Sequence, residues 1–223
     1  MPARHKSVAV CVEVGSKRVF ASAVDWPGLS RSGRDEQGAL ETLASYRNRY
    51  RPVAERAGIS LPAFSMGDLK VVERVPGSAT TDFGAPGAIA EVDHRPTSAA
   101  AARRQAALVE ASWAVFDNVV AAAPATLRKG PRGGGRDLAA IVAHVVDAER
   151  AYLRKLGLRL APFRSDQPDS LTNHRHAILE LLGRHWRPSV EDPPWPPPYG
   201  ARRIAWHALD HAWEIEDRSE PGA

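Results

Sequence analysis

The sequence lacks several features that define other protein classes. It has a single cysteine, Cys11, in 223 residues. No internal disulfide can form, which is typical of proteins in a reducing compartment. No apolar run approaches the roughly 20 residues of a transmembrane helix. Glu13 ends the first apolar run well short of a signal-peptide core. We therefore expect an untargeted cytoplasmic protein with no membrane partner.

An excess of one charge is also lacking. The 30 basic and 26 acidic residues are interspersed, and the formal net charge is +4. A dedicated nucleic-acid-binding protein presents a one-sided basic field, so nucleic acid is not an expected partner. The length suits a globular chain that buries one large core or two small ones.

The N-terminal part alternates short β-rich runs with turns. Three runs precede a helix, namely residues 7–14, 18–24 and 29–33. The Gly15-Ser16-Lys17 turn predicts a hairpin between the first two runs. Asp35 is the predicted N-cap of a helix that reaches about Ala57. Further along, residues 68–75 predict another strand, and residues 80–83 are expected to extend the same sheet.

One turn in this region carries a resemblance. Trp26-Pro27-Gly28, followed by Gly33 and the Ala39-Leu40 pair, is similar to the small domain of HicB-like antitoxins, in which three strands pack on one helix. The similarity covers about residues 7–57. The sequence that follows contains no ribbon-helix-helix or helix-turn-helix segment of an antitoxin. The resemblance implies a β-β-β-α domain, and with its strand extension we assign it residues 1–95.

The C-terminal part predicts four helices. Hydrophobic residues recur at helical spacing in residues 98–122, 136–156, 170–187 and 201–218. Pro124 stops the first helix, and the proline-dense residues 188–198 are expected to be a non-helical connector. Trp195 in this connector and Tyr199 just after it are candidates to cover a functional site between the helices. The predicted fold class is therefore α+β: a small N-terminal β-sheet plus helix domain, then a C-terminal up-and-down four-helix bundle over residues 96–223.

Two histidines of the last predicted helix carry the strongest chemical signal. His207 and His211 are four residues apart at the edge of an apolar stripe, so both imidazoles project from one face. Two histidines rarely complete a metal site. His144, at the margin of the apolar arc of the second helix, is the candidate third ligand. The competing histidines lie in the third helix and are His174, His176 and His185. Alternatively, His207 and His211 are surface histidines hydrogen-bonded to carboxylates or water.

Two acidic residues are candidates for catalytic roles. Glu149 points into the apolar arc of its helix, where an unpaired carboxylate is costly. We expect it to pair with Arg202 or Arg203, and proton transfer is the catalytic alternative. Glu214 is expected near His211, as an acceptor that orients the imidazole, a surface ion-pair partner or a fourth ligand.

The three histidines carry a second resemblance. One histidine in the second helix of a bundle, followed by His-x-x-x-His in the fourth, is similar to the DinB-like (YfiT-type) metal-binding four-helix bundles, over residues 100–218. The resemblance implies that His144, His207 and His211 bind a divalent metal. Several members are thiol-dependent transferases or isomerases. The implied function is a metal-dependent transferase that activates a low-molecular-weight thiol for attack on a small-molecule electrophile, and a homodimer is compatible with it.

The cofactors follow from the ligand types and the composition. Three neutral imidazoles leave metal positions open, as in catalytic sites. Zinc is the default ion, and nickel, manganese and iron are alternatives. Alanine and arginine are abundant, which is typical of GC-rich genomes of the actinobacterial kind. If the chain has such a source, mycothiol is the expected thiol. Cys11 is expected to lie beyond reach of the site. Arg132 and Arg136, in a glycine-rich basic loop, are candidates for cofactor binding, with an ordinary connecting loop as the alternative.

Two other function classes stay open. One is metal-dependent hydrolysis by a metal-bound hydroxide. The other is a non-catalytic binding or regulatory module whose HicB-like domain engages RNA or protein. Metal content separates both enzymes from the module, and thiol dependence separates the two enzymes.

Overall fold

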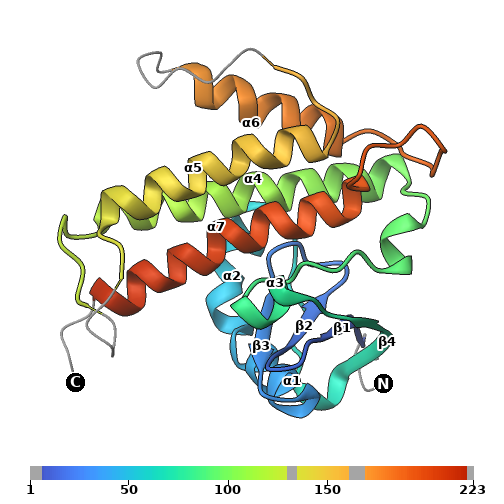
Figure 1. The fold of residues 1–223 in the computed structure, drawn as a ribbon, viewed down its shortest axis with the longest axis horizontal. Helices are drawn as coiled ribbons and strands as arrows, with labels where there is room; N and C mark the ends of the chain where they lie inside the picture. Colours follow the sequence, from blue (N-terminus) through green and yellow to red (C-terminus); the bar gives the residue numbers. More distant parts are fainter. Residues whose placement is uncertain (1–6, 130–134, 161–168, 220–223) are drawn as a thin grey trace.

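The computed structural model describes residues 7–129, 135–160 and 169–219 (Figure 1). A four-stranded sheet comes from the N-terminal part, and most helices come from the C-terminal part. In Figure 1 the sheet lies below three long helices whose axes run in roughly the same direction, α4 (Ala99–Ala122), α5 (Leu138–Lys155) and α7 (Pro197–Ser219). Helix α6 (Asp169–Leu182) lies on the side away from the sheet. The predicted α+β class is confirmed. None of the helices in these residues is long and apolar enough to cross a membrane.

The sheet has the strand order β3-β2-β1-β4. Its strands are β1 (Val8–Val14), β2 (Val19–Ala23), β3 (Ser30–Gly33) and β4 (Leu69–Pro76). The first three strands form an antiparallel meander, and β4 runs parallel to β1. A parallel pair needs a long crossover. Here the crossover contains two helices and the 3-10 helix η1 (Met66–Asp68). All four predicted strands are present.

The single helix predicted after β3 is two helices, α1 (Glu36–Ser45) and α2 (Arg47–Arg56). The predicted cap is confirmed, because the Asp35 carboxylate accepts a hydrogen bond from the Gly38 amide at 2.8 Å. The break falls at Tyr46, whose ring packs on Trp213 of α7 with 4.9 Å between centroids. Hydrophobic spacing continues through this position, so periodicity alone did not reveal the break.

Residues 80–83 do not extend the sheet, and this prediction was wrong. They belong to a short helix, α3 (Ala79–Phe83). The Ser78 hydroxyl accepts a hydrogen bond from the Thr80 amide at 3.2 Å. The Thr81 hydroxyl bonds to the Glu13 carboxylate on β1. The cap at Ser78 satisfies a backbone N–H of the first helical turn, and the Thr81–Glu13 bond fixes this helix against β1.

Four longer helices follow the 3-10 helix η2 (Glu91–His94). They are α4 (Ala99–Ala122), α5 (Leu138–Lys155), α6 (Asp169–Leu182) and α7 (Pro197–Ser219). Helix α7 packs against the other three, most extensively against α4, and α6 also contacts α4 and α5. Two boundaries differ from prediction. Helix α6 ends before Arg187, and α7 begins inside the proline-dense segment because prolines in a first helical turn need no backbone N–H partner.

The core is continuous between the sheet and the long helices. Leu108 and Ala111 of α4, with Leu209 and Trp213 of α7, pack into the same core as the sheet, α1 and α2. Other faces of α4 and α7 pack with α5 and α6. The domain boundary between residues 95 and 96 stays a prediction, but the two parts share buried side chains.

The Trp26-Pro27-Gly28 turn is one point of this junction. Gly28 has a φ of 92°, a backbone conformation that favours glycine. A Cβ atom there would lie 2.6 Å from Leu209 Cδ1 and 3.2 Å from Ala205 Cβ. The turn therefore approaches α7 more closely than any other residue type allows. This close approach places α7 directly against the sheet side of the molecule.

Candidate metal centre

The three predicted ligands come together between α5 and α7. The candidate ligand nitrogens of His144, His207 and His211 all lie within 4.8 Å of one another. His144 Nε2 and His207 Nε2 are 3.2 Å apart. Two imidazole nitrogens on one tetrahedral zinc ion lie about 3.3 Å apart, given the usual bond lengths. Among the described residues, no other group of three or more His, Cys, Asp or Glu side chains meets this spacing.

Glu214 fixes the orientation of one ring. Its Oε2 atom lies 2.8 Å from His211 Nδ1, and its Oε1 atom accepts a hydrogen bond from Arg218 at 2.8 Å. The bond from His211, with help from Arg218, lowers the pKa of Glu214. An ionised Glu214 accepts a hydrogen bond from the Nδ1–H group of His211. The proton then stays on Nδ1, and the Nε2 lone pair of His211 is available to a metal. This position fits the predicted acceptor role and the ion pair rather than a fourth ligand.

His207 is the most buried of the three, with 6% of its surface exposed. Its Nδ1 atom has no hydrogen-bond partner in the described part of the chain. Burial, followed by the charges of His211 and Arg203, lowers the pKa of His207 well below its ordinary value. Burial also lowers the pKa of His144. Buried polar atoms without partners are rare. The nitrogen of His207 that faces the other imidazoles is Nε2. Burial favours the neutral ring, and a divalent cation binds neutral rings.

The glycine-rich loop contributes positive charge near this centre. Arg136 is exposed, and its charge helps to lower the pKa of both His144 and His207. Its role in cofactor binding stays a prediction. Arg132 lies outside the described residues.

Glu149 has a different partner from those predicted. It accepts hydrogen bonds from Arg175 of α6, at 3.1 Å from Nε and 3.2 Å from Nη2. Arg175 also reaches Asp117 of α4 at 2.8 Å. Burial raises the pKa of Glu149, and the Arg175 charge opposes this rise. The expected pairing with Arg202 or Arg203 was wrong because Glu149 faces α6 and α4, whereas both of those arginines belong to α7.

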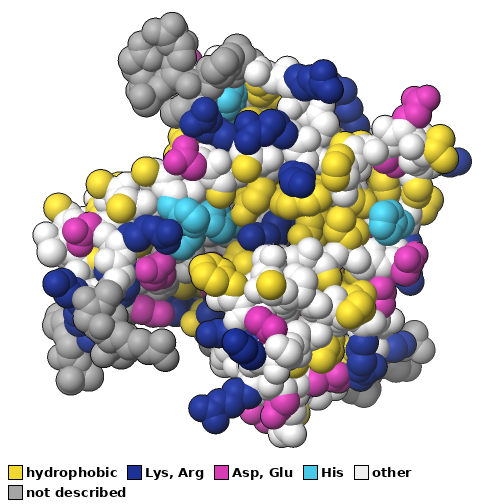
Figure 2. Space-filling view, in the orientation of Figure 1, with side chains coloured by type: hydrophobic (Ala, Val, Ile, Leu, Met, Phe, Trp, Pro, Cys, Tyr) yellow, Lys and Arg dark blue, Asp and Glu magenta, His cyan; other side chains and the backbone are white. Residues whose placement is uncertain are grey.

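Aromatic rings border the histidines. The Tyr152 ring lies 5.8 Å from the His207 ring, and the Trp195 ring lies 4.9 Å from Tyr152 and 5.0 Å from Tyr199. Trp195 and Tyr199, which were expected to cover the site, therefore reach it through Tyr152, a residue that was not singled out from the sequence. Its position two turns after His144 on the same face was the available signal. In Figure 2, histidine side chains reach the surface over α5 and α7, beside an area of hydrophobic side chains.

The competing histidines of the third predicted helix lie elsewhere. His174 is buried in α6. His176 is exposed and lies 3.6 Å from Glu180, and His185 is exposed beyond the end of α6. None of these three belongs to the cluster of ligand nitrogens formed with α7.

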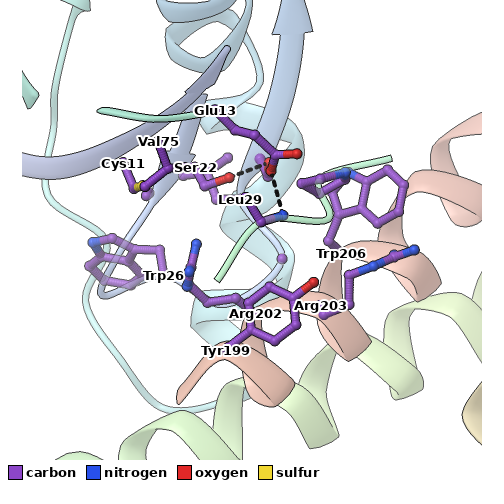
Figure 3. A pocket seen from close by; sticks show the side chains of 15 residues that line it. Cys11, Glu13, Ser22, Trp26, Leu29, Val75, Tyr199, Arg202, Arg203 and Trp206 are labelled. Atoms are coloured by element: carbon purple, nitrogen blue, oxygen red, sulfur yellow. Dashed lines mark hydrogen bonds between the residues drawn. The ribbon is translucent and has the colours of Figure 1, made fainter. Parts of the chain in front are cut away.

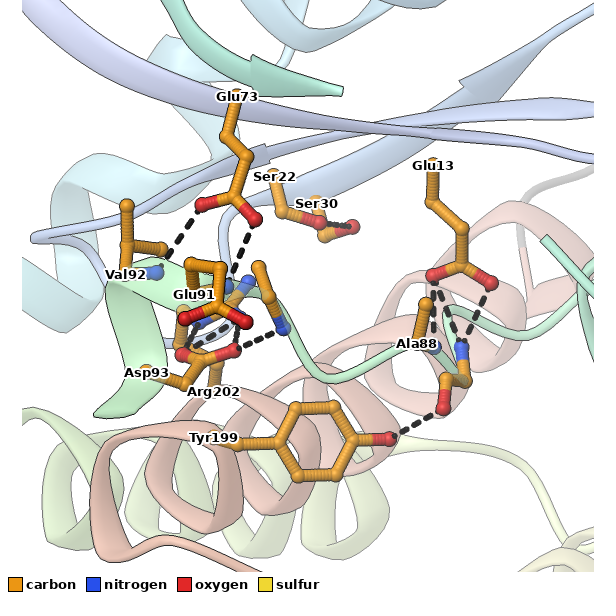
Figure 4. A network of polar contacts seen from close by, with 12 residues as sticks. Glu13, Ser22, Ser30, Glu73, Ala88, Glu91, Val92, Asp93, Tyr199 and Arg202 are labelled. Atoms are coloured by element: carbon orange, nitrogen blue, oxygen red, sulfur yellow. Dashed lines mark hydrogen bonds and ion pairs between the residues drawn. The ribbon is translucent and has the colours of Figure 1, made fainter. Parts of the chain in front are cut away.

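A second polar cluster lies where α7 meets the sheet (Figure 4). Asp93 of η2 accepts hydrogen bonds from Arg202 at 2.5 to 3.2 Å and from the Ala90 amide at 2.9 Å. The Glu13 carboxylate accepts hydrogen bonds from the Gly87 and Ala88 amides, each at 3.0 Å. Tyr199 donates to the Gly87 carbonyl at 3.1 Å. The hydrogen bonds tie α7 to the sheet, and sequence reasoning did not find this cluster.

Cys11 belongs to the sheet side of this junction. Cys11 is 4% exposed and belongs to β1. Together with Arg202 and Tyr199 it lines a pocket between the sheet and α7 (Figure 3). Burial raises the pKa of its thiol to about 11. A buried thiol of high pKa is a poor nucleophile. This agrees with the expectation that Cys11 does not supply the reacting thiol.

Comparisons with known proteins identify no relative. No family model matches the chain, and no significant match was found among curated proteins or solved structures. The HicB-like and DinB-like resemblances therefore stay predictions.

Proposed function

We propose that this chain is a divalent-metal-dependent transferase in which a low-molecular-weight thiol attacks a small-molecule electrophile. In this proposal α4 to α7 form a DinB-like four-helix bundle, joined to a HicB-like N-terminal domain. Zinc is the expected ion, with nickel, manganese and iron as alternatives, and mycothiol is the expected thiol. The observation that carries the proposal is the convergence of three imidazoles at ligand spacing, one of them buried.

The roles of the side chains follow from their surroundings. His144, His207 and His211 would hold the ion, and burial favours the neutral form that this requires in the first two. Glu214 keeps the proton of His211 on Nδ1. A divalent ion held there would lower the pKa of a bound thiol, so that thiolate is present near neutral pH.

The thiol is expected to come from outside the chain. The single cysteine is buried at the junction with the sheet, and its raised pKa opposes thiolate formation. Three imidazoles would leave further coordination positions of a bound ion open, so a diffusible thiol would have room to bind. Tyr152 and Trp195 border one side of the site and limit its access to water.

Metal content is the first test. The protein is purified without a histidine tag or chelator, and metal per chain is measured by elemental analysis for the wild type and the His207→Ala, His211→Ala double variant. We expect about one ion per wild-type chain and none in the variant. A matched control is His176→Ala, which removes an exposed imidazole outside the centre. A wild type that stays metal-free after incubation with zinc, nickel and manganese would refute the enzyme proposal and favour the binding module.

Thiol dependence then decides between the two enzyme classes. Loss of a candidate electrophile is followed with and without added thiol, using metal-loaded protein. Consumption that requires the thiol supports the transferase. Consumption by water alone, at the same metal content, would replace it with a metal-dependent hydrolase.

A further inference from the structure

Arg203 differs from the other partly buried arginines of this region. Arg202 is paired with Asp93, Arg218 with Glu214, and Arg175 with Glu149. Arg203 forms no ion pair with an Asp or Glu of the described residues, and its Nη1 atom is buried without a hydrogen-bond partner. Buried cations are usually paired, so an arginine without a carboxylate partner marks a place for an anion.

The neighbours of Arg203 are aromatic. Its guanidinium carbon lies 4.6 Å from the centre of the Trp206 ring and 5.3 Å from that of Tyr152. The Tyr152 hydroxyl is also within its hydrogen-bonding reach. Figure 3 shows Arg203 extending beside Trp206, while Arg202 leaves the same helix towards the sheet. The rings hold the guanidinium plane in place without neutralising its charge.

This guanidinium adjoins the candidate metal centre. Arg203 precedes His207 by one turn of α7. Tyr152 contacts both residues, since its ring lies 5.8 Å from the His207 ring. The Arg203 charge also contributes to the lowered pKa of His207. A small molecule with one end at the three imidazoles therefore has Arg203 within a few bond lengths of its other end.

We propose that Arg203 binds a carboxylate group of the small molecule that reacts at the three histidines; mycothiol has no free carboxylate, so with that thiol the group belongs to the electrophile. This inference rests on the proposed function, because it names the class of ligand that the site accepts. A guanidinium presents two parallel N–H donors that match a carboxylate. The Arg203 guanidinium balances one negative charge. Of the other charges that act on His144, Arg136 is exposed to solvent, whereas Glu214 and Asp147 act against a dianion such as phosphate.

The test compares two thiols that differ only in this charge. Full-length protein loaded with Co²⁺ is titrated with 3-mercaptopropionate and with the neutral 3-mercaptopropionamide, and the thiolate-to-cobalt absorption band reports binding. We expect the wild type to bind the carboxylate about tenfold more tightly than the amide. Arg203→Met should remove this preference and leave the affinity for the amide unchanged. Arg203→Lys, which keeps the charge but loses the two parallel N–H donors of the guanidinium, should show an intermediate preference.

The control variant is Arg154→Met, which removes an exposed arginine from α5. It should keep the wild-type preference. Equal affinity of the wild type for both thiols, or a preference that survives in Arg203→Met, would overturn the proposal.

Failure of the metal centre gives a different result. A chain that takes up no Co²⁺ refutes the proposed function, and Arg203 is then tested alone in the metal-free protein. Tryptophan fluorescence is followed with butyrate and butyramide, because the Trp206 ring lies against Arg203. A response to butyrate alone that is lost in Arg203→Met would retain the anion site. If the fluorescence of the wild type does not respond to butyrate, the proposed anion site at Arg203 is refuted as well.

Discussion

Helix α7 carries two polar clusters that differ in how completely their atoms are bonded. At the junction with the sheet, Arg202 and Asp93 are 11% and 2% exposed in their side chains and bond to each other. At the other cluster, Nδ1 of His207 and Nη1 of Arg203 are buried without partners. Arg202 and Arg203 are neighbours in sequence, so the helix alone does not cause this difference. A saturated cluster holds the fold, whereas an unsaturated one retains atoms that a ligand can satisfy.

The two clusters therefore respond differently to mutation. Removing a group from the saturated cluster leaves its partner buried and unpaired, which destabilises the fold. Removing a group from the unsaturated cluster breaks few existing bonds, so the loss appears in ligand binding. This trade of stability for binding is typical of functional sites.

The largest expected effect is on metal content. The His207→Ala, His211→Ala double variant should lose the bound ion completely, while helix content changes little because α7 keeps its apolar packing. Elemental analysis and circular dichroism check the two parts. Retention of stoichiometric metal in this variant would remove the two histidines from the ligand set.

The next effect is on stability. Asp93→Ala leaves the Arg202 guanidinium buried without its carboxylate. We expect unfolding in urea to show a loss of about 3–5 kcal/mol. Glu55→Ala, which breaks an ion pair whose side chains are 63% and 67% exposed, is the control. It should cost less than about 1 kcal/mol. Equal losses in the two variants would contradict the contrast between the clusters.

A smaller effect is expected at Glu214. Glu214→Gln keeps the shape of the side chain but weakens its hold on the His211 proton and on Arg218. Metal affinity should fall about 10–100-fold, as for other residues that orient a ligand. Competition with a chromophoric chelator measures the change. Glu216→Gln, which alters a carboxylate paired with Arg49, should leave the affinity unchanged.

The smallest effect is expected at Cys11. Because its pKa is raised from 9.0 to about 11, the native thiol should be about a hundredfold less ionised at pH 8 than an ordinary thiol. A disulfide reagent should therefore label it slowly in the native protein and rapidly in urea. Cys11→Ala should leave metal content and thiol-dependent activity unchanged. Fast native labelling, or loss of activity in the variant, would show that Cys11 takes part.

Local signals predicted much of the fold. The hairpin at Gly15-Ser16-Lys17, the Asp35 cap and the strand at residues 68–75 depend on neighbouring residues, and all are present. The break at Tyr46 and the helix at residues 79–83 depend on contacts with α7 and with Glu13 on β1. Those contacts join residues far apart in sequence, so periodicity did not report them.

The candidate site divides in the same way. By itself, the sequence determined that His207 and His211 share a helix face, since a four-residue spacing is one helical turn, and it indicated His144 as a third ligand. The tertiary structure decided which residues complete the surroundings. Packing of α5 on α7 places Tyr152 next to His207, and packing of α5 on α6 pairs Glu149 with Arg175. The approach of η2 pairs Arg202 with Asp93, whereas Arg203 has no carboxylate partner among the described residues. Side-chain partners depend on which helix faces meet, and only the packed chain determines that.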